Sequence, residues 1–92
     1  MTQDALTEII ESRLREALSP TELQVWDDSD AHKGHAGAAK GGGHFEVLIT
    51  SDRFSGLRPI ARHRLVYDAL GDLMHSQIHA LSINAKTPDE SL

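Results

Sequence analysis

The stretch Phe45-Glu46-Val47-Leu48-Ile49-Thr50-Ser51 is the clearest strand in the chain. Phe45, Val47 and Ile49 fall on one side because side chains alternate across a strand, so this side forms an apolar face. The segment Leu23 to Asp27, further upstream, alternates apolar and polar residues in the same way. The two segments therefore predict a pair of strands that lie side by side as a wide hairpin.

Helical patterns flank this hairpin on both sides. From Leu6 to Leu18 the apolar residues recur every three or four positions, and Ser19-Pro20 ends the pattern. After the hairpin, Pro59 suits the first turn of a short helical element, and a longer helix is predicted from about Ala61 to Met74. The last strand is predicted from Ile78 to Asn84.

The predicted order is therefore α-β-β-α-α-β, a two-layer α+β domain with a three-stranded sheet and helices on one face. A chain of 92 residues makes one domain, so we expect a single unit over residues 1–92. A flexible loop is predicted at about 28–43, where five of the seven glycines lie. A loose tail is predicted from about residue 87, where Thr87-Pro88-Asp89-Glu90 has the sequence of a helix start.

Composition limits the chemistry. The chain has no cysteine, so it offers neither a disulfide nor a thiolate ligand. No signal peptide or membrane span is evident in the sequence, and we expect a cytoplasmic protein. The net charge of −5 argues against general nucleic-acid binding. Even so, four of the nine Lys and Arg residues lie within twelve positions, and they predict a local basic patch formed by Arg53, Arg58, Arg62 and Arg64.

Six histidines invite a metal hypothesis, but their spacing does not form a self-contained zinc site. His32 and His35 are three positions apart, and a structural zinc ion wants four ligands. For His35, His44 and His75 we expect the ordinary solvated or hydrogen-bonded role. No nucleophile and base pair can be recognised, so we expect no enzymatic activity.

His79 differs because regular strand alternation puts it on the same face as Leu81 and Ile83. One interpretation is a histidine at the edge of the core, satisfied by a backbone carbonyl or a loop acid. The other is a metal ligand at the start of the strand, which His32 or His35 of the loop could join. Two histidines replace two cysteines on one iron of a Rieske-type cluster, and here a partner would have to supply thiolates.

The segment Arg62-His63-Arg64 also allows two interpretations. It could form a solvated basic helix face whose aliphatic stems pack down. It could equally form a surface for an anion or an acidic partner, because arginine matches carboxylate and phosphate groups.

Together these segments resemble the BolA-like family. The resemblance covers about Leu6 to Pro88 and rests on five separated motifs and a C-terminal end in the family's order. They are Asp28-Ser29-x-x-His32-x-Gly34-His35, His44-Phe45-x-Val47, Ser51-x-x-Phe54-x-Gly56, Arg62-His63-Arg64-x-Val66-Tyr67-x-x-Leu70, and Ile78-His79-Ala80-Leu81 followed by Lys86-Thr87-Pro88.

The resemblance implies a fold like a class II KH domain and a partner, a monothiol glutaredoxin of the CGFS type. It implies a 2Fe-2S cluster shared between the glutaredoxin cysteine, a glutathione thiol and histidine from this chain, and no cofactor when the chain is alone. The family's C-terminal ligand maps onto His79, and its loop ligand maps onto His32, with His35 as the competitor. The resemblance also implies a role for this chain in iron–sulfur trafficking and in iron or stress regulation.

The same resemblance carries an alternative function, that of a DNA-binding transcriptional regulator. Its surface would include Arg58, Arg62, His63 and Arg64. Whether the apo protein forms a homodimer is left open by the sequence.

Overall fold

The computed structural model describes residues 3–27 and 43–90. In chain order its elements are α1 (Gln3–Leu18), β1 (Glu22–Asp27), β2 (Gly43–Thr50), the short 3-10 helix η3 (Asp52–Phe54), α2 (Pro59–Leu70), α3 (Leu73–Ser76) and β3 (Ile78–Lys86). The α+β class, the order α-β-β-α-α-β and the three-stranded sheet are confirmed. The loop predicted at about 28–43 lies outside the described residues, except for Gly43, which begins β2.

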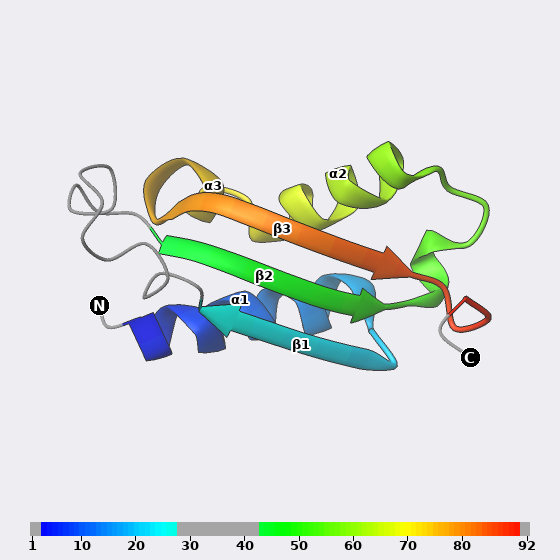
Figure 1. Cartoon of the computed structure of the whole chain (residues 1–92), viewed down its shortest axis with the longest axis horizontal. Coiled ribbons are helices and arrows are strands. Elements are labelled where there is room, and N and C mark those ends of the chain that lie inside the picture. The colour runs from blue at the N-terminus through cyan, green and yellow to red at the C-terminus, as the bar shows by residue number, and fades with distance from the viewer. Residues whose placement is uncertain (1–2, 28–42, 91–92) are drawn as a thin grey trace.

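The sheet has the order β1-β2-β3, with the strongest predicted strand in the centre. The predicted hairpin is confirmed, because β1 and β2 are antiparallel and Val25 lies opposite Val47. β2 and β3 are parallel, since the chain crosses over through α2 and α3 before it returns to the sheet. The starts of β2 and β3 therefore lie at the same end of the sheet (Figure 1).

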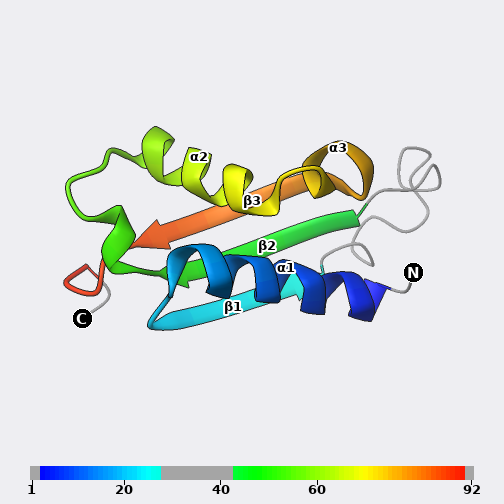
Figure 2. The same ribbon diagram turned by 180° about the vertical axis from the view of Figure 1, so that it is seen from behind.

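The core lies between the sheet and the helices. In Figure 2, α1 crosses the face of the sheet that is turned away from the viewer in Figure 1. The buried apolar side chains are Leu6, Ile10, Leu14 and Leu18 of α1, Phe45, Val47 and Ile49 of β2, and Phe54, Val66, Leu70, Leu73 and Ile78. The opposite face of the sheet carries exposed side chains such as Trp26 and Glu46.

The end of α1 is fastened to the segment that follows β2. Ser19, after the last residue of the helix, has a φ of 45° and its N–H donates to the carbonyl of Arg15. The buried hydroxyl of Ser51 donates to the carbonyl of Leu18 at 2.6 Å and accepts from the N–H of Arg53 at 3.1 Å. Ser51 thus satisfies one helix end and caps the start of η3.

The prediction of a single long helix over residues 61–74 is wrong at both ends of that helix. The helix begins earlier, because Pro59 is in the first turn of α2 itself and not in a separate element. It ends at Leu70, because Gly71 adopts a φ of 56°, a conformation that favours glycine, and α3 starts only at Leu73. Arg13 of α1 stabilises this break by donating to the carbonyl of Leu70 at 2.8 Å.

Candidate metal centre

His79 does not lie on the core face, as regular strand alternation predicted. The register between β2 and β3 pairs Gly43 with Ile78 and His44 with Ala80, which leaves His79 as an extra residue in a bulge. Ile78 is consequently buried, whereas His79 is exposed. The interpretation of His79 as a core-edge histidine beside Leu81 is therefore wrong, and its imidazole is accessible at the start of β3.

The bulge brings His79 beside a second imidazole, that of His44 at the start of β2. The centroids of the two rings are 5.2 Å apart and their planes are tilted by 48°. His44 is half-buried. From the sequence, His44 is predicted to be an ordinary solvated or hydrogen-bonded histidine, because periodicity within one strand gives no information about which residue of another strand lies beside it.

The other predicted metal ligands are not tested by the structure. His32 and His35 lie outside the described residues, so their assignment stays a prediction. Within residues 3–27 and 43–90 no group of three or more His, Cys, Asp or Glu side chains could hold a metal ion. Any metal bound at His79 would therefore need further ligands from outside the described residues.

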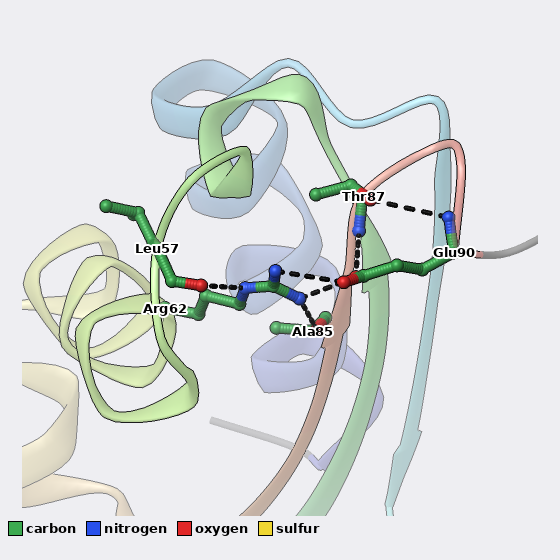
Figure 3. A network of polar contacts seen from close by, with 5 residues as sticks. All are labelled: Leu57, Arg62, Ala85, Thr87 and Glu90. Carbon is green, nitrogen blue, oxygen red and sulfur yellow. Dashed lines mark hydrogen bonds and ion pairs between the residues drawn. The ribbon is translucent and has the colours of Figure 1, made fainter.

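Arg62, predicted as part of a partner or nucleic-acid surface, is engaged inside the domain (Figure 3). Its Nε donates to the carbonyl of Leu57 at 2.9 Å, and its Nη1 donates to the carbonyl of Ala85 at 3.1 Å. The guanidinium also makes a bidentate ion pair with Glu90, at 2.6 and 3.1 Å. This network joins α2 to the end of β3, and only 13% of the Arg62 side chain is exposed.

Glu90 is hydrogen-bonded both to Arg62 and to Thr87. Its carboxylate accepts from the N–H of Thr87 at 2.8 Å, and its own N–H lies 3.4 Å from the Thr87 hydroxyl. This is the reciprocal pattern of the predicted capping box, here in a turn. Residues Thr87 to Glu90, where we expected the loose tail to begin, are thus hydrogen-bonded to the domain (Figure 3).

The same contacts predict an acid-sensitive contribution to stability. Hydrogen bonds from Arg62 and then from Thr87 lower the pKa of Glu90 to about 2, from an ordinary value of 4.5. A carboxyl whose pKa is lower in the folded state stabilises the fold above its unfolded pKa and loses this effect as the pH falls through the folded one. We expect Glu90→Gln to lower the free energy of unfolding at pH 7 and the difference from wild type to vanish between pH 4.5 and 2.

Urea unfolding at a series of pH values checks this expectation. Asp89→Asn is the matched control, because Asp89 is an exposed neighbour for which no ion pair is seen within the described residues. A difference between Glu90→Gln and wild type that stays constant down to pH 2 would contradict the account.

The remaining members of the predicted basic patch are exposed. Arg53, Arg58 and Arg64 point into solvent, and His63 is half-buried. Arg58 and Arg62 lie at the start of α2, beside the end of β3, whereas His79 lies at the start of β3 (Figure 1). Because the domain is 40 Å long, the basic end and the histidine pair form separate surfaces.

A groove of about 650 Å³ lies beside the turn between α2 and α3. It is lined by Tyr67, Asp68, Gly71, Asp72, Met74 and His75. Arg13 donates to the Asp72 carboxylate at 3.1 Å and lowers its pKa, so this side chain stays ionised. The carboxylates of Asp68 and Asp72 make this groove unfavourable for the phosphate backbone of a nucleic acid.

Comparison with known proteins identifies the family. The sequence model described as BolA-like protein matches residues 14–90, most of the chain. This chain belongs to the BolA-like family. The BolA-like match includes both histidines of the pair and the whole Arg62 network.

Named relatives agree with this assignment. The chain is 41% identical over 85 residues to the DNA-binding transcriptional regulator BolA of Vibrio cholerae. This match covers 92% of the chain and 77% of that protein. The chain is 46% identical over 86 residues to SufE-like protein 1, chloroplastic/mitochondrial, of Arabidopsis thaliana. That match covers 88% of this chain but only 23% of the relative, so this BolA-like chain spans about a quarter of its length.

A solved structure confirms the fold of the BolA-like domain. The BolA domain of SufE1 from Arabidopsis thaliana superposes with a TM-score of 0.82 at 43% identity and covers 98% of both chains. None of the helices within residues 3–27 and 43–90 has the length and apolar character needed to span a membrane.

Proposed function

We propose that this BolA-like chain is a non-enzymatic adaptor that binds a monothiol glutaredoxin of the CGFS type and shares a 2Fe-2S cluster with it. The observation that carries the proposal is the exposed imidazole of His79, which a bulge places at the start of β3 beside a second imidazole. An accessible histidine at the end of a rigid sheet can reach a metal held by another protein, whereas a core histidine cannot.

The donor set fits a shared cluster. The chain has no cysteine and supplies imidazole alone, so the thiolates come from the glutaredoxin cysteine and from glutathione. His79 is the ligand on this side, and His32 or, in its place, His35 is the second ligand that the family resemblance suggests. The shared cluster would serve iron–sulfur trafficking or the regulation of iron and stress responses. We propose that the protein acts in the cytoplasm.

A second function, DNA-binding transcriptional regulation, is favoured by one relative. The Vibrio cholerae protein is named a DNA-binding transcriptional regulator. Here such binding would use the exposed Arg58 and Arg64 with His63 at the basic end of the domain. Arg62 contributes less to this surface than the sequence suggested, because its guanidinium is engaged with Glu90 and with two carbonyls.

Anaerobic co-expression with a tagged monothiol glutaredoxin of the CGFS type tests the proposed adaptor. We expect the chain to be captured as a one-to-one heterodimer with iron and sulfide in equal amounts. We also expect a visible circular dichroism spectrum that differs from that of the glutaredoxin alone. The control is a glutaredoxin whose active-site cysteine is replaced by serine, which removes one thiolate ligand. Capture of iron by the glutaredoxin with no bound BolA-like chain would refute the proposal.

A further inference from the structure

We infer that His44 and His79 together form a two-imidazole metal-binding pair, in which His44 of β2 is a ligand that the family resemblance does not name. The pair takes a borderline transition metal, such as a zinc ion, or one iron of the cluster. This inference rests on the proposed function for the identity of the bound group, but the pair itself rests on the geometry of β2 and β3.

The bulge is the first observation. With regular pairing, His79 would follow the phase of Leu81, whose side chain packs against the core. The extra residue in β3 breaks that phase, so Ile78 remains in the core while His79 is exposed. Bulges commonly redirect one side chain near a functional site, and here the redirected side chain lies beside His44.

The separation of the rings is the second observation. A zinc–nitrogen bond is about 2.0–2.1 Å, and the centre of an imidazole lies roughly 1 Å beyond its nitrogen, so two imidazoles on a tetrahedral ion have centroids about 5 Å apart. The centroids of His44 and His79 are 5.2 Å apart. The centroid spacing of the pair thus matches the spacing of two imidazoles on one metal ion.

The backbone under both histidines is fixed. The N–H of Gly43 donates to the carbonyl of Gln77 at 2.9 Å, which ties the start of β2 to the residue before β3. Gly43 leaves space for the ring of Phe45, which a Cβ at that position would overlap. His44 and His79 therefore project from neighbouring strands, and ligands on strands are held more precisely than ligands on loops.

Zinc titration of the chain alone tests the pair. In long-range proton–nitrogen NMR of the imidazoles, we expect the signals of His44 and His79 to shift together, with one apparent dissociation constant. His44→Asn and His79→Asn, which keep a polar side chain of similar size, should each weaken this binding by at least about tenfold. His75→Asn is the control, because His75 is an exposed histidine on the neighbouring α3.

Two outcomes would overturn the inference. One is zinc bound at His79 while the His44 signals stay in place, and the other is His44→Asn with unchanged affinity and an unchanged thermal melt. Failure of the adaptor proposal is recognised separately. If no glutaredoxin heterocomplex holds iron while the zinc results stand, the shared cluster is wrong and the histidine pair is correct. If the heterocomplex forms and His44→Asn leaves its visible spectrum unchanged, the pair does not ligate the cluster.

Discussion

His79→Ala is expected to shorten the lifetime of the proposed shared cluster while leaving the fold intact. The imidazole of His79 is exposed on a bulge, so its loss opens no cavity in the core. In the proposed heterocomplex, however, the substitution removes a ligand by which this chain would hold iron. Because loss of even an outer partner of a metal ligand costs 10–100-fold in affinity, we expect the variant complex to lose its cluster at least about tenfold faster.

The measurement is the visible circular dichroism of the reconstituted heterocomplex, followed over time under anaerobic conditions. His75→Ala serves as the matched control, since it removes an exposed histidine from α3 at the same end of the domain. An unchanged spectrum and cluster lifetime in His79→Ala would show that His79 is not a ligand.

Phe54→Ala is expected to cause the largest loss of stability. Phe54 is fully buried in the core, although it belongs to the short helix η3 and not to a strand or a long helix. Truncation of a buried phenylalanine costs about 3–5 kcal/mol, through lost burial and the cavity that remains. A domain is stable by only about 5–15 kcal/mol, so the variant should be largely destabilised or unfolded at 37 °C.

Urea unfolding of both proteins gives the difference in the free energy of unfolding. Ile60→Ala is the control, because Ile60 lies on the first turn of α2 and the residue is 65% exposed. A surface change of this kind should stay within about 0.5 kcal/mol. A loss below about 1 kcal/mol for Phe54→Ala would show that η3 packs less firmly than its burial indicates.

The strands and the first helix could be predicted from the sequence because each leaves a local signal. The alternation at Phe45, Val47 and Ile49 identified the central strand, and Ser19-Pro20 marked the end of α1. The helix end at Gly71 could not be predicted, because the helical pattern of apolar residues continues on both sides of this glycine. Glycine alone does not show whether a helix tolerates it or ends there.

The site depended on features that no single segment encodes. The bulge at His79 is a property of the register between β2 and β3, so strand alternation put this histidine on the wrong face. The contact with His44 depends on the same register. Likewise Arg62 belonged to an evident basic run, but its partner Glu90 is 28 residues away in sequence. Sequence showed which groups were present, and the tertiary fold determined which of them meet.

Ligation of the proposed shared cluster by a histidine of this chain is tested most directly by the Mössbauer spectrum of the captured heterocomplex. Imidazole on one iron makes the two irons of the cluster unlike each other, since the other iron keeps sulfur ligands only. We predict two iron sites of equal intensity in the wild-type complex. One iron environment, identical to that of the cluster held by the glutaredoxin without this chain, would contradict the account.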